Sequence, residues 1–188
     1  PQPTLKWKFK AGNQYGSPTV VNGVVYAGSR DGNLYAIDAA SGGKKWNFRT
    51  ADRITSSPAV DKDVVYIGST DGNVYALDIA TGSQRWNLTT GANIYGGPVL
   101  ADGRVYITNR SGTLHALDVT SGKLAWKIQT GGANDLVTPS AAVAGGVVYA
   151  IGTDRRLYAI DAAYGFQRWV AGTGYLTGPS IADGTTLY

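Results

Sequence analysis

The sequence predicts an all-β fold built from repeated four-stranded antiparallel sheets, and three observations lead to this prediction. Tryptophan recurs at intervals of 39 to 43 residues, at Trp7, Trp46, Trp86, Trp126 and Trp169. Proline recurs at intervals of 40 or 41 residues, at Pro18, Pro58, Pro98, Pro139 and Pro179. Short apolar runs separated by turn-forming residues fill each interval, and no stretch keeps a helical period. A period of this length is typical of repeat architectures.

The first repeat shows the expected order of elements. Strands are predicted at residues 17–21, 24–29, 34–38 and 44–48. The turns between them contain Asn or Gly, the residues that most easily adopt positive φ. In the last strand, Trp46 and Phe48 alternate with polar residues, as expected for a strand with one buried face. A four-stranded sheet of about 40 residues repeated around an axis is the blade of a β-propeller.

Each repeat also carries an Asp, a Gly four positions later and a Trp eight positions later. The set is Asp38, Gly42, Trp46; Asp78, Gly82, Trp86; Asp118, Gly122, Trp126; and Asp161, Gly165, Trp169. The stretches AIDAASGGKKW, ALDIATGSQRW, ALDVTSGKLAW and AIDAAYGFQRW resemble the tryptophan-docking repeat of the pyrroloquinoline-quinone-like (PQQ-like) propeller family, over essentially the whole chain. This resemblance implies that each Trp packs between adjacent blades, in a slot shaped by the Ala, Asp and Gly. Tyr164 stands where the other repeats have Ser or Thr, so a differently capped turn is expected there.

The strand count predicts one propeller domain over residues 1–188. Its complete blades are expected at about 11–50, 51–90, 91–130 and 131–173, followed by a partial blade at 174–188. A lone outer-type strand around Trp7, within residues 1–10, is expected to complete that fifth blade and close the ring. The alternative is an excised arc of a larger ring.

Few side chains are available for acid–base or metal chemistry. The chain has no Cys, one His, and thirteen acidic residues that are all Asp. Eleven of them lie in the docking motifs or in hairpins, where a single carboxylate per turn falls short of the oxygen ligands that calcium takes. The other two, Asp52 and Asp135, lie in interblade loops. His115 takes the position of Tyr35, Tyr75 and Tyr158, which predicts a structural substitution; we therefore expect no catalytic residue, metal site or cofactor.

The net charge of +4 is expected to lie on the outer strands. The face formed by the interblade loops and the hairpins between second and third strands, here called the loop face, balances five Arg against five Asp. The excess sits on outer strands and their hairpins, for example at Lys45, Arg49 and Arg85. A charged edge that blocks strand addition is the simpler interpretation, and an anion-binding rim is the alternative. No specific nucleic-acid binding and no membrane span are expected.

The interblade loops differ between repeats, unlike the blades themselves. They place five candidate binding residues on the loop face: Tyr15, Arg53, Tyr95, Asp135 and Tyr175. Variable loops on a rigid scaffold commonly carry binding residues, although packing of the loops alone would explain them too.

Two functional classes follow from the resemblance. Members of the PQQ-like family include extracytoplasmic assembly factors and receptor sensor domains, in which the propeller binds a protein or ligand without catalysis. This predicts a non-enzymatic, extracytoplasmic scaffold with an unidentified protein partner or small ligand. The alternatives are a fragment of a PQQ-dependent quinoprotein dehydrogenase, whose paired cysteines and calcium carboxylates have no counterpart here, and a lectin-like sugar-binding propeller.

Overall fold

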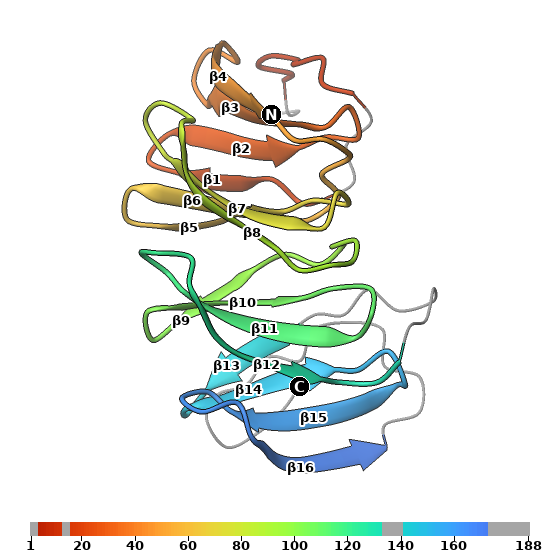
Figure 1. Ribbon diagram of the computed structural model, residues 1–188. Helices are drawn as coiled ribbons and strands as arrows, with labels where there is room; N and C mark the ends of the chain where they lie inside the picture. Colours follow the sequence, from red (N-terminus) through yellow and green to blue (C-terminus); the bar gives the residue numbers. More distant parts are fainter. Residues whose placement is uncertain (1–3, 13–15, 133–140, 173–188) are drawn as a thin grey trace.

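The computed structural model describes residues 4–12, 16–132 and 141–172, in which the chain forms sixteen strands and no helix (Figure 1). The sixteen strands form four antiparallel sheets of four strands each, and within every sheet the strands lie side by side in the order in which they occur in the sequence. The first sheet contains β1 (Thr19–Val21), β2 (Val24–Gly28), β3 (Asn33–Asp38) and β4 (Lys44–Arg49). The second contains β5 (Ala59–Asp61), β6 (Val64–Gly68), β7 (Asn73–Asp78) and β8 (Gln84–Thr89). The third contains β9 (Val99–Ala101), β10 (Arg104–Thr108), β11 (Thr113–Asp118) and β12 (Leu124–Gln129). The fourth contains β13 (Ala141–Ala144), β14 (Val147–Ile151), β15 (Arg156–Asp161) and β16 (Gln167–Gly172).

We call these sheets blades 1 to 4, and each lies within one of the four repeats read from the sequence. The first strand of each blade lies on the inner side and contacts the first strand of the next blade: β1 contacts β5, β5 contacts β9 and β9 contacts β13. The blades follow one another face to face (Figure 1). The apolar core therefore lies between neighbouring blades: Trp46 of blade 1, for example, belongs to the same cluster as Ile67 and Leu77 of blade 2.

Tight hairpins join the first two strands of each blade. Asn22 and Gly23 both have positive φ, 48° and 73°, and the flanking Val21 and Val24 pair directly. This is the backbone of a two-residue turn that matches the twist of the strands it connects, and it favours Asn and Gly.

A bulge interrupts the pairing of the third and fourth strands at the same place in every blade. In blade 2, Ala76 pairs with Trp86 whereas the adjacent Leu77 pairs with Gln84, so Arg85 has no direct partner across the strands. The same shift occurs at Ala36, Ala116 and Ala159. A bulge of this kind redirects the side chain of the extra residue.

The N-terminal segment differs from its prediction as a strand. Residues 4–10 are described but carry no strand pairing. They nevertheless lie against blade 1 as an outer strand would. Phe9 contacts Tyr35 with ring centroids 5.2 Å apart, as Phe48 of blade 1 contacts Tyr75 of blade 2 at 5.3 Å. Residues 173–188 lie outside the described residues, so the fifth blade and its closure remain predictions.

Candidate functional site

The outer-strand tryptophans of blades 1 to 3 each contact the following blade. Trp46 donates its indole N–H to the carbonyl of Ile79 at 3.0 Å. Trp86 makes the equivalent bond to Val119 at 3.2 Å, and Trp126 to Ala162 at 3.0 Å. Trp7 makes the same bond to Ala39 of blade 1 at 3.0 Å. One donor–acceptor pattern thus recurs at four successive positions along the chain.

The Asp of each repeat organises the turn on which this Trp rests. In blade 2, Oδ1 of Asp78 accepts hydrogen bonds from the amides of Ala80 and Thr81 and from the Thr81 hydroxyl. The turn brings Gly82, with φ of +74°, under the Trp46 ring. Blade 4 keeps the two amide bonds to Asp161. Tyr164 has no short hydroxyl that could donate a third hydrogen bond to Asp161, and its ring stacks on Phe166 instead.

In blades 2 and 4, the second carboxylate oxygen of the same Asp binds the redirected bulge residue. Nη2 of Arg85 lies 2.7 Å from Asp78 and 2.6 Å from Asp63, and Arg168 lies 2.7 Å from Asp161. The hydrogen bond from Arg85, together with those from Thr81, lowers the pKa of Asp78 to about 2. Some of the basic residues on the outer strands are therefore paired with the carboxylates of the docking motif.

Trp169 is expected to pack against a fifth blade, which lies outside the described residues, so its interblade position remains a prediction. It is 43% exposed, whereas Trp46 is 9% exposed. Among the described residues, Trp169 packs against Tyr149 of its own blade, with ring centroids 6.1 Å apart. The described residues contain no blade after blade 4, so no neighbouring turn among them covers this ring.

A buried Tyr on the second strand of blades 2 and 3, Tyr66 and Tyr106, shares the interblade contact, and this residue was missed in the sequence. The Tyr66 hydroxyl donates to the Val119 carbonyl at 3.1 Å, the same oxygen that accepts from Trp86. The rings of Tyr66 and Trp86 lie 5.8 Å apart. Recurrence of Tyr at 26, 66, 106 and 149 was the available signal.

The carboxylates of the hairpins between second and third strands are also used within the blade. Asp31 accepts bonds from the Asn33 amide and the Tyr35 hydroxyl, and Asp71 does the same with Asn73 and Tyr75. Burial raises the pKa of Asp31, but its hydrogen bonds outweigh this effect and hold the pKa well below its usual range.

Blade 3 replaces both members of this Asp–Tyr pair. Ser111 stands at the Asp position and His115 at the Tyr position, and His115 pairs with Ile107 in the register in which Tyr75 pairs with Ile67. His115 is 4% exposed and burial lowers its pKa. A buried neutral imidazole in a tyrosine position agrees with a structural substitution.

The loop face contains two of the five candidate binding residues within the described part of the chain. The side chain of Arg53 is exposed, whereas Tyr95 is half-buried. The Tyr95 hydroxyl accepts a hydrogen bond from Arg110 at 3.4 Å, and the guanidinium lies 6.0 Å from the ring centroid. Tyr15, Asp135 and Tyr175 lie outside the described residues.

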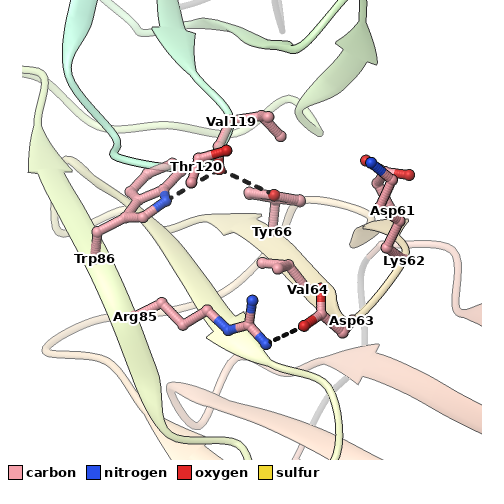
Figure 2. A pocket seen from close by; sticks show the side chains of 9 residues that line it. All are labelled: Asp61, Lys62, Asp63, Val64, Tyr66, Arg85, Trp86, Val119 and Thr120. Atoms are coloured by element: carbon pink, nitrogen blue, oxygen red, sulfur yellow. Dashed lines mark hydrogen bonds and ion pairs between the residues drawn. The ribbon is translucent and has the colours of Figure 1, made fainter.

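The opposite face, formed by the first-to-second and third-to-fourth hairpins, carries a pocket that the sequence does not predict (Figure 2). Its volume is about 180 Å³, and it lies between blade 2 and the Val119–Thr120 turn of blade 3. Figure 2 shows Arg85 bound to Asp63 beside the Tyr66 and Trp86 bonds to Val119. The charges of Arg85 and Asp63 in this pocket thus neutralise one another. The signal was the Asp61–Lys62–Asp63 hairpin, which is unlike the Asn–Gly, Asp–Gly and Gly–Gly hairpins of the other blades.

Across 4–12, 16–132 and 141–172, no three His or Asp side chains are grouped so that they could hold a metal ion. The described part of the chain also has no helix with the length and apolarity needed to cross a bilayer.

Repeated four-stranded blades joined through their tryptophans define a β-propeller of PQQ-like repeats. A family model described as outer membrane protein assembly factor BamB matches residues 3–96 and 92–181, so the chain belongs to this PQQ-repeat family. A comparison with curated protein sequences finds no significant match.

Solved propellers share the fold at low sequence identity. BamB from Moraxella catarrhalis is 24% identical with a TM-score of 0.76, over 87% of this chain and 55% of that one. Quinohemoprotein alcohol dehydrogenase from Comamonas testosteroni is 19% identical with a TM-score of 0.74, over 85% and 35%. The computationally designed Ika8 protein is 18% identical with a TM-score of 0.75, over 87% and 51%. The predicted fold class is confirmed, and the chain spans about half or less of the length of each of these structures.

Proposed function

We propose that this chain is a non-enzymatic binding module that recognises a protein partner through the loop face. The observation that carries the proposal is the use of the carboxylates. The side chains that a hydrolase or quinoprotein would need, such as Asp31, Asp78 and Asp161, act as acceptors that hold turns and bulges. Because these carboxylates stabilise the scaffold, recognition of a partner is left to residues of the variable loops.

Membership of a family described as an outer membrane protein assembly factor supports association rather than chemistry. By extension, the partner is a component of outer-membrane protein assembly, and the module acts outside the cytoplasm, where that membrane lies. The loop residues proposed to contact the partner are Arg53 and Tyr95, together with Tyr15, Asp135 and Tyr175.

Photo-crosslinking in cells tests the choice of face. A photoreactive phenylalanine at position 95 should give one discrete adduct, and the same residue at position 123, on the exposed hairpin of the opposite face, should not. Mass spectrometry of the adduct identifies the partner. An adduct formed only from position 123, or equally from both positions, would reject the loop face.

The quinoprotein alternative is favoured by one observation, the structural similarity to a quinohemoprotein alcohol dehydrogenase. Among the described residues, Asp63 and Asp78 are bound to Arg85, and no three Asp or His side chains are grouped so that they could hold calcium. Calorimetry with pyrroloquinoline quinone and calcium, followed by dye reduction with an alcohol, separates the two functions. Saturable micromolar binding with turnover would establish the dehydrogenase.

A further inference from the structure

Three arginines from different elements meet on the loop face of blade 1. Arg30 comes from the hairpin between β2 and β3, Arg49 from the end of β4, and Arg53 from the loop leading to blade 2. All three are exposed and line one cavity of about 200 Å³. We call it the arginine pocket; its remaining lining consists of Asp31, Gly32, Thr50, Ala51 and Asp52.

Backbone contacts fix the floor of the arginine pocket. The amide and hydroxyl of Thr50 both donate to the Gly32 carbonyl, at 2.8 and 3.0 Å. The Arg53 carbonyl accepts from the amide and the hydroxyl of Thr70, at 2.9 and 3.1 Å. The main chain from which Arg49 and Arg53 extend is therefore held in place before any ligand arrives.

Blade 2 repeats this frame without the arginines. Thr90 donates to the Gly72 carbonyl at 2.8 and 3.0 Å, as Thr50 does to Gly32, and Asp71 accepts the bonds that Asp31 accepts. The three arginine positions are occupied there by Thr70, Thr89 and Asn93. Because the frame is complete without them, the three arginines are not required to build it.

We propose that the arginine pocket binds a side-chain carboxylate from an acidic segment of the protein partner. This rests on the proposed function, since it gives the chemistry of the partner that the loop face recognises. Guanidinium groups match the planar geometry of carboxylates and bind them through paired hydrogen bonds.

The charge of the pocket favours a carboxylate over a phosphate group. Three arginines face two carboxylates, Asp31 and Asp52, which leaves one net positive charge. Asp31 stays ionised, because its hydrogen bonds hold its pKa well below the usual range. A carboxylate of charge −1 balances the pocket, whereas a phosphate monoester carries about −1.5 to −2 at neutral pH and would face two carboxylates.

Titration of the ¹⁵N-labelled chain, followed through the arginine Nε–Hε signals, tests the proposal. The probes are a capped tetraglutamate peptide, a capped tetraserine peptide and inorganic phosphate. Tetraglutamate should shift the signals of Arg30, Arg49 and Arg53 saturably, and tetraserine should not. The double variant R49T/R53N should weaken the affinity by about fivefold or more, in keeping with the loss of two exposed ion pairs.

Two further variants complete the design. R156T, which gives blade 4 the residue found at Thr113 in blade 3, removes a loop-face arginine elsewhere and should leave the affinity within about twofold. T89R/N93R, which keeps Thr70 on the Arg53 carbonyl, should create a second site on blade 2. Absence of saturable shifts, equal binding by R49T/R53N, or tighter binding of phosphate than of tetraglutamate would overturn the proposal. If such a result were obtained while the residue at position 95 still crosslinked to the partner, only the proposed acidic segment would be rejected. The loop face would remain the proposed docking surface.

Discussion

The indole ring of Trp46 lies directly against Gly82 of the next blade. A Cβ atom on Gly82 would come within 2.6 Å of Cε3 of the ring, and Gly82 has φ of +74°. Two separate constraints, space and backbone conformation, therefore act on one residue.

Replacing Gly82 by Ala should lower the free energy of unfolding by about 2–5 kcal/mol, because it combines a strained backbone with overpacking against Trp46. Gly103 is the matched control: its φ is +73°, but nothing lies within 4 Å of its Cβ position. Gly103→Ala should cost only the backbone contribution, about 1–2 kcal/mol. Equal losses in urea denaturation would show that the ring contact contributes nothing.

Trp46→Ala should lower the free energy of unfolding by about 3–5 kcal/mol, the usual cost of removing a buried aromatic side chain. Trp169→Ala should cost about 1 kcal/mol or less, because its ring is 43% exposed. Urea denaturation of the two variants provides the comparison. A loss at Trp169 as large as that at Trp46 would mean that this ring, too, is covered in solution.

The Arg85–Asp78 ion pair should make stability depend on acid pH. The pKa of Asp78 in the folded chain is about 2, below its ordinary value of 3.8. A carboxyl with a lowered folded-state pKa contributes stability above its unfolded-state pKa, and this contribution is lost as pH falls through the folded-state value. The difference in unfolding free energy between wild type and Arg85→Ala should therefore shrink between about pH 4 and pH 2.

Lys44→Ala provides the control for this prediction, since Lys44 contacts Asn47 rather than an Asp. Its effect on stability should not vary over the same pH range. Carboxyl NMR should also show the pKa of Asp78 rising in Arg85→Ala. An unchanged Asp78 titration would assign the low pKa to the turn amides and Thr81.

Tyr95→Ala should leave the melting temperature within a few degrees, as expected for a change below about 1 kcal/mol. It should weaken binding of the crosslinked partner at least about tenfold, because Tyr is frequent at binding hot spots. Lys123→Ala, on the exposed hairpin of the opposite face, should leave binding unchanged. Unchanged affinity of the triple variant of Tyr15, Tyr95 and Tyr175 would move the site elsewhere.

Nucleic acid should bind only weakly and in a salt-sensitive manner. Basic residues such as Lys45, Arg85 and Arg168 lie on different blades and face the motif carboxylates at 2.7 to 3.9 Å. Filter binding at physiological salt should give a dissociation constant in the micromolar range or weaker, which is typical of nonspecific binding. A value below about 100 nM would contradict this expectation.

The blade architecture was predictable because one sequence pattern occurs four times along the chain. The spacing of Asp, Gly and Trp locates the third-to-fourth turn and the outer strand in each copy, and the structure places them there. The N-terminal segment was only partly predictable. Its Trp7 and Phe9 make the contacts of an outer strand, but strand pairing also requires a neighbouring strand, which the described residues do not supply.

The arginine pocket and the paired bulge residues could not be read from the sequence. Alternation along the outer strand predicts that Arg49 and Arg85 point outward with the other basic residues. The bulge turns Arg85 back to Asp78, and the end of β4 brings Arg49 beside Arg30 and Arg53. Residues 19 and 23 positions apart became neighbours through pairing between strands, which a repeat pattern does not specify.

The direction of the tryptophan bonds has a consequence for how the chain is made. Each indole precedes the carbonyl that receives it, by 32 residues for Trp7, 33 for Trp46 and Trp86, and 36 for Trp126. Since a ribosome releases the N-terminus first, every ring has already emerged when its receiving turn is synthesised. The donor and the acceptor of each of these four junctions therefore lie within a stretch of chain shorter than a single repeat, and neither comes from a segment still to be synthesised.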